Sequence, residues 1–278
     1  TPYCFEAYLG LYDVTGEERY LEIATSITNF IFSDLHAVAD GPVTAAGSYS
    51  PLDRSMVVNA TAYRAFVLIE AAERFGKPEF REVAMRHVRF VLKHQREDGS
   101  WFYAVGNEAE KFIDHFHTCF VLKNLFKLNR RLGSPEVDEA IGKGIGFYRE
   151  HLFDALGNPR SFAIEPRLRI VRLEMYDFAE AITLGALLAG EHSEAFAMAR
   201  DLVDRLVGEH QLPAGHFVTR VYRGGFRHTV PFLRWPQAQL FHALTNFLVA
   251  AARESVPRMS ADKEISPKRS DSEPVVPA

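Results

Sequence analysis

The sequence predicts an all-α protein, an α/α toroid built from helical hairpins. A repeat of about 57 residues, glycine-centred turns at matching places in that repeat, and apolar residues at helical spacing around each turn predict this fold. Gly16, Gly76 and Gly133 are 60 and 57 residues apart. Because period, turn residue and apolar spacing agree, each unit is expected to be one helical hairpin.

Each unit is read as a first helix, a short turn and a second helix. The first helices are expected at Tyr3–Tyr12, Val58–Phe75, His117–Leu132, Tyr176–Ala189 and Pro236–Arg253. The second helices are expected at Glu18–Leu35, Pro78–Gln95, Pro135–Leu152 and Ser193–Glu209. Glycine after a helix and proline at the next helix start are ordinary stop and start signals. About four and a half hairpins are therefore visible in this chain.

The connections between hairpins are much longer than the turns inside them. They span Ala37–Val57, Arg96–Phe116, Phe153–Met175 and His210–Arg234. Since each hairpin returns the chain to its starting end, all four long loops must emerge at one end. If the row of hairpins curves shut, the first helices line the inside, and loops and helix N-termini meet at one mouth, where ligands usually bind. The alternative is an open solenoid with a concave groove.

Composition narrows the classes of partner. The chain has 278 residues, 47% of them hydrophobic, with a net charge of -4 and a pI of about 6.3, which argues against binding nucleic acid. It contains no apolar run of about 18 residues, so no membrane span is expected. No signal peptide is visible, which favours the cytoplasm. The chain starts with Thr1 almost inside a helix, so we expect natural sequence to be missing before it.

Two further expectations concern the cysteines and the end of the chain. Cys4 and Cys119 fall on apolar helical faces and are read as reduced core residues. Residues 1–253 are assigned to the toroid domain. Glu254–Ala278 is rich in Ser, Pro and charge without periodicity, so we predict a disordered tail.

The long loops and the helix starts beside them carry the candidate site residues. Aromatic rings can stack on sugars, Arg forks bind carboxylates, paired carboxylates serve glycosidic acid/base chemistry, and His or Tyr can abstract a proton. The candidate catalytic residues are Tyr103, Asp114, His117, Glu174 and Asp177. The candidate substrate-binding residues are Arg54, Trp101, His115, Arg220, Arg234 and Trp235. This mixture suits an acidic saccharide.

Each candidate also has a structural interpretation. Asp114 could only cap a helix, and His117 could be a satisfied core histidine. Glu174 and Asp177, three residues apart, could be charge caps at a helix N-terminus. The tryptophans could be packing wedges between hairpins. His115 and His117 have i,i+2 spacing and do not share a helical face, so no zinc site and no cofactor are expected.

Three motifs carry a resemblance to known proteins. They are DGSWFY (Asp98–Tyr103), IDHFHT (Ile113–Thr118) and LRWPQAQLFHAL (Leu233–Leu244). With them, the region Pro51–Ala252 resembles the α/α-toroid superfamily of six-hairpin glycosidases, uronate polysaccharide lyases and terpenoid cyclases. Within it, the chain resembles uncharacterised bacterial proteins associated with polysaccharide biosynthesis. The resemblance implies action on a polysaccharide, and a complete six-hairpin toroid has more hairpins than are visible here.

The leading hypothesis is a protein that acts on an anionic, uronate-containing polysaccharide in exopolysaccharide or capsule metabolism. Hydrolysis would use Asp114 with Glu174 or Asp177 as acid and base. β-Elimination would use His117 or Tyr103 as base, with Arg220 or Arg234 neutralising the uronate.

Two other hypotheses stay open. One is a non-catalytic module that holds a glycan or protein, and the other is an isoprenoid-handling relative with a deep, wholly apolar cavity. Two carboxylates about 5–10 Å apart across the mouth would favour hydrolysis. Carboxylates tied to Arg or to helix N-termini would favour binding or a structural role. The sequence predicts no particular oligomeric state.

Overall fold

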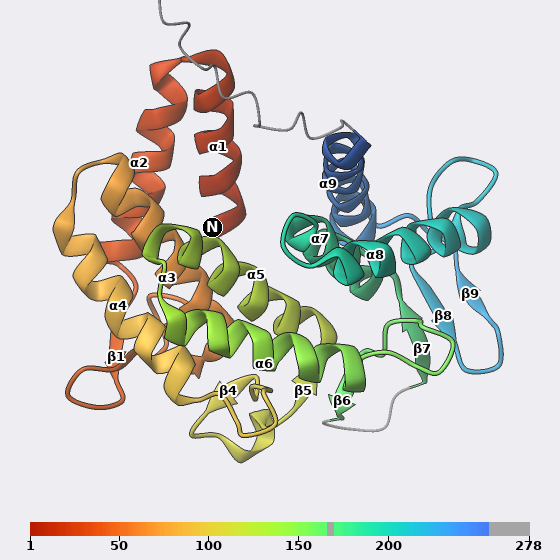
Figure 1. The fold of residues 1–278 in the computed structure, drawn as a ribbon, viewed down its shortest axis with the longest axis horizontal. Helices are drawn as coiled ribbons and strands as arrows, with labels where there is room; N and C mark the ends of the chain where they lie inside the picture. The colour runs from red at the N-terminus through yellow and green to blue at the C-terminus, as the bar shows by residue number, and fades with distance from the viewer. Residues whose placement is uncertain (166–169, 256–278) are drawn as a thin grey trace, which may run out of the picture.

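The structure is a computed structural model that describes residues 1–165 and 170–255. Over these residues the chain forms four helical hairpins and a final single helix, arranged along an arc (Figure 1). The hairpins are α1 (Pro2–Thr15) with α2 (Glu18–Ser33), α3 (Val58–Arg74) with α4 (Pro78–Lys93), α5 (His115–Leu132) with α6 (Pro135–His151), and α7 (Met175–Leu188) with α8 (Ser193–Arg205), followed by α9 (Ala238–Ser255). The predicted α/α toroid architecture is confirmed. Apart from its first two residues, which end α9, the predicted tail lies outside the described residues.

The turns inside the hairpins have the predicted chemistry. Gly16 and Gly133 adopt left-handed backbone conformations, with φ of 68° and 60°, and cap α1 and α5. Each donates its N–H to the carbonyl four residues earlier, which satisfies one of the last carbonyls of the helix. Pro78 and Pro135 occupy the first positions of α4 and α6, where a missing N–H removes no helical hydrogen bond.

The first helices are buried and the second helices face solvent in the middle of the row. Most residues of α3, α5 and α7 are buried, whereas α4, α6 and α8 bury one face each. The helices at the two ends of the row differ. In α1 only Phe5 and Leu9 are buried, and α9 exposes Phe241 and Leu248. An end helix has a neighbouring hairpin on one side only, so the burial rule holds for the middle of the row alone.

The exposure of α1 at the end of the row also explains why one of the two cysteines is not the core residue that was predicted. Cys119 on α5 is buried as expected, but Cys4 on α1 is exposed, and both thiols are free. Among the described residues, none of the helices is long and apolar enough to cross a membrane.

The long loops contain short strands, which the all-α prediction omitted. They are β1 (Ala37–Ala39), β2 (Ala45–Gly47), β3 (Met56–Val57), β4 (Ala104–Val105), β5 (Ile113–Asp114), β6 (Phe162–Ile164), β7 (Val171–Glu174), β8 (Arg220–Tyr222) and β9 (Arg227–His228). β3 pairs with β4, β5 with β6, and β7 with β8, all antiparallel. Each of these pairs joins one long loop to the next. The prediction that all the long loops emerge at the same end is confirmed.

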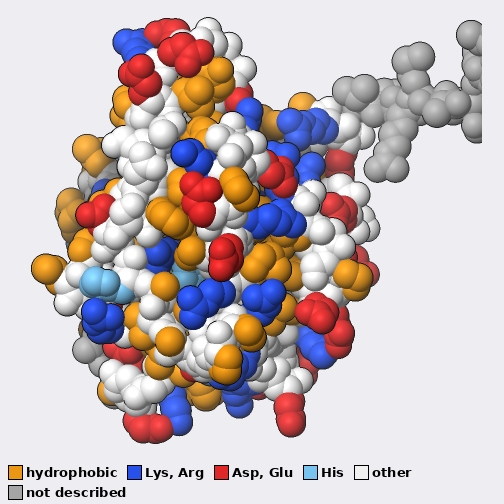
Figure 2. All heavy atoms as spheres, turned by 90° about the vertical axis from the view of Figure 1, so that its left-hand side faces the viewer, with side chains coloured by type: hydrophobic (Ala, Val, Ile, Leu, Met, Phe, Trp, Pro, Cys, Tyr) orange, Lys and Arg blue, Asp and Glu red, His pale blue; other side chains and the backbone are white. Residues whose placement is uncertain are grey.

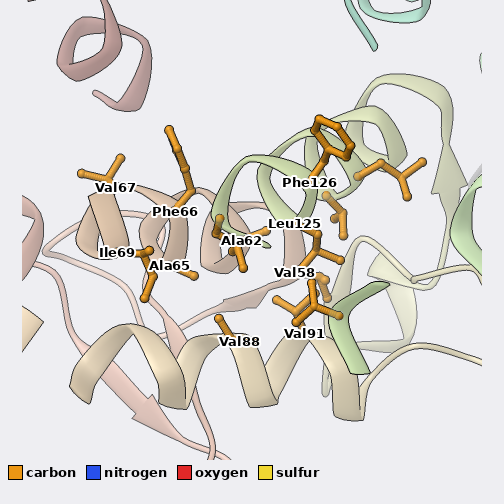
Figure 3. Close-up of a cluster of buried hydrophobic side chains, with 14 of the residues drawn as sticks. Val58, Ala62, Ala65, Phe66, Val67, Ile69, Val88, Val91, Leu125 and Phe126 are labelled. Atoms are coloured by element: carbon orange, nitrogen blue, oxygen red, sulfur yellow. The ribbon is translucent and has the colours of Figure 1, made fainter. Parts of the chain in front are cut away.

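Aliphatic and aromatic side chains fill the space between the helices. Figure 3 shows part of this core, where α3 lies between α4 and α5. The residues labelled there from these three helices are Val58, Ala62, Ala65, Phe66, Val67, Ile69, Val88, Val91, Leu125 and Phe126. The packing of α5 on α7 and of α7 on α9 continues the row, so the inner helices hold one another in place around the arc.

Charged side chains of both signs are interspersed on the face shown in Figure 2. Two ion pairs join neighbouring inner helices: Arg74 of α3 with Asp13 of α1, and Arg131 of α5 with Glu70 of α3. Exposed pairs of this kind contribute about 0–1 kcal/mol each. They add specificity to the helix order more than stability.

Trp101 is a packing wedge, one of its two sequence interpretations. Its side chain is 4% exposed, and its indole nitrogen donates to the carbonyl of Val91 at 2.9 Å. A Cβ placed on Gly144 of α6 would lie 2.8 Å from the Trp101 ring. The expected substrate contact of Trp101 is therefore not supported, because the ring is enclosed between α4 and α6.

Replacement of Gly144 tests this packing. Gly144→Ala should lower the free energy of unfolding by about 1–3 kcal/mol, because the methyl group overlaps the Trp101 ring and Leu122. The matched control is Gly142→Ala in the same helix, where a Cβ meets nothing within 4 Å. That change should stabilise the protein by about 0.5–1 kcal/mol through helix propensity. Urea unfolding followed by circular dichroism measures both, and equal effects of the two variants would contradict the wedge.

Candidate functional site

A large pocket opens at the end of the toroid where the paired loops meet. Its volume is about 1060 Å³, at the upper end of the usual range for ligand sites. Its walls come from β5 to β8, the first turns of α5 and α7, and the helical turn Leu233–Gln237 before α9. The lining residues are Phe112, Asp114, Phe116, His117, Phe162, Ile170, Val171, Glu174, Tyr176, Asp177, Thr219, Arg220, Phe232, Arg234 and Trp235.

Most of the candidates chosen from the sequence line this one pocket. They are Asp114, His117, Glu174, Asp177, Arg220, Arg234 and Trp235. Tyr103 joins them from behind, since its ring centroid lies 4.6 Å from that of His117. Strand pairing explains the convergence, because β5–β6 and β7–β8 draw together loops that are far apart in the sequence.

Asp114 and His117 form a hydrogen-bonded pair in the pocket wall. His117 Nδ1 lies 2.7 Å from Asp114 Oδ2, and Asp114 is 3% exposed. Asp114 occupies the N-cap position of α5, but its side chain accepts no capping hydrogen bond. The cap-only interpretation of Asp114 is therefore not supported. With the proton on Nδ1 assigned from this contact, Nε2 of neutral His117 carries a lone pair.

Aromatic rings hold His117 in place and distinguish its role from that of Tyr103. The His117 ring lies 4.2 Å from Phe116 and 4.6 Å from Tyr103, centroid to centroid. Burial raises the pKa of Tyr103, and nearby acidic groups, Asp114 among them, raise it further. The phenol therefore keeps its proton at neutral pH. Of the two bases suggested by the sequence, His117 fits the role better, because it lines the pocket and the Tyr103 phenol stays protonated.

The other two carboxylates of the pocket are engaged. Glu174 of β7 lies opposite Arg220 of β8 in the sheet register, and Arg220 Nε donates to Glu174 Oε2 at 2.7 Å. The buried carboxylate of Asp177 accepts a hydrogen bond from Ser161 Oγ at 2.6 Å. Neither arrangement is that of an isolated acid or base poised toward the pocket.

Arg234 and Trp235 give the pocket a cation and an aromatic surface. Trp235 is 47% exposed and stacks on Tyr176 at 4.7 Å with an interplanar angle of 18°. The Arg234 guanidinium lies 6.0 Å from the Trp235 ring centroid. Within the described residues Arg234 has no ion pair with a carboxylate, so it differs from Arg220.

Besides the enclosed Trp101, and Tyr103 behind His117, two further candidates lie outside the pocket lining. His115 is fully buried, with Nδ1 3.2 Å from the Leu152 carbonyl and Nε2 2.9 Å from the Tyr148 hydroxyl. The structure therefore does not support its predicted substrate contact, and the spacing gives the reason: His115 and His117 lie on different faces of α5. Arg54 is exposed in the loop before β3 and lies outside the pocket lining.

The sequence analysis missed a buried polar network between α5 and α7, which reaches the pocket lining through Tyr176. Lys123 of α5 and Glu180 of α7 form a buried ion pair. The Tyr63 hydroxyl lies 2.9 Å from that of Tyr3, and Tyr176 bonds to both Tyr3 and Glu180. Burial raises the pKa of Tyr3 to about 12. The available signal was Lys123 and Glu180, each flanked by apolar residues in its helix. The charged residues that line the pocket do not match the wholly apolar cavity that the isoprenoid hypothesis required.

Metal binding has no support in the geometry of the described residues. Over these residues no three His, Cys, Asp or Glu side chains come close enough together to hold a metal ion. The expectation that no cofactor takes part stays a prediction.

Several solved structures share this architecture, whereas the comparison of sequences found no match. No protein-family model and no curated protein matches the chain. Among solved structures, it is similar to a sugar epimerase from a ruminal bacterium, with a TM-score of 0.71 at 14% identity over 90% of this chain and 72% of the other. It is also similar to an unsaturated glucuronyl hydrolase specific for heparin, with a TM-score of 0.67 at 15% identity over 90% and 73% of the two chains. A polysaccharide lyase gives a TM-score of 0.62 at 12% identity over 91% and 73%.

These likenesses establish the fold. The chain has an α/α-toroid fold, as its sequence motifs indicated. At this level of identity, the residues of the pocket, and not the neighbours, must carry the argument about chemistry.

Buried His115 and His87 should make the protein acid-sensitive. Burial lowers the pKa of each to about 3, so below pH 6.5 the unfolded state binds protons that the folded state does not. Stability should therefore fall between pH 6.5 and 3, by up to about 1.4 kcal/mol per pH unit for each histidine. The free energy of unfolding is measured by urea titration at pH 7, 6 and 5. It should fall less steeply with decreasing pH in His115→Gln than in wild type. In exposed His192→Gln it should fall as in wild type, and equal slopes in all three proteins would contradict the assignment.

Proposed function

We propose that this chain is a carbohydrate-active enzyme that transfers a proton at a sugar carbon, with His117 as base and Asp114 orienting it. The observation that carries the proposal is the 2.7 Å hydrogen bond from His117 Nδ1 to buried Asp114 in the wall of the pocket. It fixes the tautomer that leaves Nε2 able to accept a proton. Structural neighbours named as epimerase, glucuronyl hydrolase and lyase support a saccharide as the substrate.

The pocket suits a sugar that carries a carboxylate. Trp235, Phe112 and Phe162 offer aromatic surfaces, and Arg234 offers a guanidinium that no described carboxylate neutralises. A carboxylate held by Arg234 would make the hydrogen on the adjacent carbon more acidic, because charge developing at that carbon is delocalised toward the carboxylate. Arg220 already pairs with Glu174, so it supports the wall of the pocket before it supports the substrate.

In β-elimination, residues of this site can carry out every proton transfer. His117 Nε2 takes the proton from the carbon next to the carboxylate, and the electrons of that C–H bond form the new double bond. The bond from the neighbouring carbon to the leaving oxygen breaks, and that oxygen takes the proton from the His117 imidazolium, which restores the neutral base. In epimerisation the first step is shared, and the proton returns to the other face of the carbon.

Two other activities have less support. Hydrolysis requires a carboxylic acid and a carboxylate across the pocket, whereas Glu174 is tied to Arg220 and Asp114 to His117. A non-catalytic glycan-binding module accounts for the aromatic surfaces and Arg234 but leaves the Asp114–His117 pair without a task. A role in bacterial exopolysaccharide or capsule metabolism, and a cytoplasmic location, rest on the sequence resemblance and are part of the proposal.

Turnover on a panel of neutral and uronate oligosaccharides tests the reaction. Absorbance of unsaturated uronate, release of reducing ends and deuterium uptake from D₂O are recorded together. His117→Ala and Asp114→Asn should each lower kcat by about 10²–10⁴-fold, since one removes the base and the other its orientation.

The outcomes separate the candidate reactions. Unsaturated product indicates elimination, deuterium uptake without a new chain end indicates epimerisation, and reducing ends without unsaturation indicate hydrolysis and contradict the proposal. His192→Ala, at an exposed site away from the pocket, controls for the loss of a histidine. A ligand-induced thermal shift without turnover would favour the binding module.

Arg234 should select the carboxylated substrate. Arg234→Gln should raise KM for a uronate oligosaccharide about tenfold or more, because a charge-assisted hydrogen bond is lost, and should leave binding of a neutral oligosaccharide nearly unchanged. Arg223→Gln, an exposed arginine outside the pocket lining, is the matched control. Equal losses for charged and neutral sugars would show that Arg234 does not read the carboxylate.

A further inference from the structure

Two buried acceptor atoms, one of Asn59 and one of Asp114, lie next to the Asp114–His117 pair. Asn59, the second residue of α3, is 6% exposed, and Asp114 is 3% exposed. Within the part of the chain that the structure describes, Asn59 Oδ1 and Asp114 Oδ1 have no hydrogen-bond donor. Both residues line one small cavity of about 10 Å³, together with Tyr103, His117, Thr118 and Trp101.

The size and chemistry of this cavity match one water molecule. A cavity of roughly 10–15 Å³, measured for the centre of a water-sized probe, holds one water when polar partners are present. A water has two O–H donors, and the two buried oxygens are both acceptors. The neighbouring hydroxyl of Thr118 is already used, since it donates to the Asp114 carbonyl at 2.6 Å. Buried acceptors without donors are rare in folded proteins, so a donor is required here.

We propose that one buried water bridges Asn59 Oδ1 and Asp114 Oδ1, and that Asn59 thereby acts as a positioning residue for the Asp114–His117 pair. The water holds one carboxylate oxygen while His117 holds the other, so the carboxylate cannot turn about its side-chain bonds. Backbone hydrogen bonds hold the start of α3, which carries Asn59, against the segment that carries Tyr103. The Val58 N–H donates to the Tyr103 carbonyl at 3.0 Å, and β3 pairs with β4 beside it.

Loss of the water should weaken the hold of Asp114 on His117. A carboxylate oxygen left without a donor is relieved either by taking a proton or by rotating toward another donor. Protonation removes the negative charge beside His117, and rotation moves that charge away. In both cases the pKa of His117 falls, because a nearby negative charge favours the imidazolium.

The test is the titration of His117 in the full-length protein by heteronuclear NMR, which requires no substrate. Asn59→Leu removes the acceptor and keeps the branching and the number of side-chain heavy atoms, and Asn59→Asp keeps an acceptor oxygen in the same shape. Asp114→Asn marks the pKa reached when the carboxylate is lost. The other ionisable groups that face His117 or share its pocket are Tyr103, Glu174, Asp177, Arg220 and Arg234, and none of them is altered.

The expected result is a His117 pKa in Asn59→Leu that is lower by at least about half a unit, part of the way to the Asp114→Asn value. Exchange of the Nδ1 proton with solvent should also be faster. Asn59→Asp should show no fall, because it retains the acceptor and adds negative charge. An unchanged His117 pKa in folded Asn59→Leu would overturn the proposal, and so would a fall of the same size in Asn59→Asp.

A high-resolution crystal structure of the wild-type protein gives a second measurement that does not depend on variants that fold. Density for one water within hydrogen-bond distance of Asn59 Oδ1 and Asp114 Oδ1 supports the proposal. Direct contact of either oxygen with the Tyr103 hydroxyl, with no water between, overturns it. The role of Asn59 in catalysis rests on the proposed function, but both measurements are made without turnover. A protein that holds the water and shows no activity would therefore refute the enzyme and leave the bridge intact.

Discussion

Antiparallel pairing between successive long loops is the constraint on which the site depends. Each helical hairpin packs on its neighbours through its apolar face, but nothing in a hairpin places the loop that follows it. The pairs β3–β4, β5–β6 and β7–β8 join each loop to the next one, so residues about 50 positions apart become neighbours. The pairing also satisfies backbone groups that the loops would otherwise bury without partners at the mouth.

The packing of the inner helices and the pairing of the loops together position the residues of the pocket. Packing of α3, α5 and α7 sets the position of each helix start, and the strand just before each start sets its direction. Asp114 illustrates the result: it ends β5 and precedes α5, and its side chain turns back to His117 instead of capping the helix. A carboxylate that does not cap its helix is unusual enough to indicate that it has another partner to hold.

A buried polar network joins α5 to α7 next to the pocket. Tyr176 connects the Lys123–Glu180 pair to the stacked ring of Trp235. Burying an ion pair contributes little to stability by itself, since desolvation offsets the attraction. Removing one partner alone is costly, because the other charge is then buried without compensation, so the two helices depend on each other at this point.

The sequence by itself determined the hairpin repeat, the boundaries of most helices within about two residues, and the convergence of the long loops. These follow from local signals, since Gly133, Pro135 and the apolar spacing around them act over one or two turns of chain. Tertiary structure alone decided which candidates face the pocket. Trp101 and His115 sit in the same motifs as Tyr103 and His117, yet they are buried, because α6 supplies the walls around them: Gly144 meets the Trp101 ring and Tyr148 meets the His115 ring. Such contacts join residues more than 30 positions apart, and no local pattern encodes which of two neighbouring side chains they will cover.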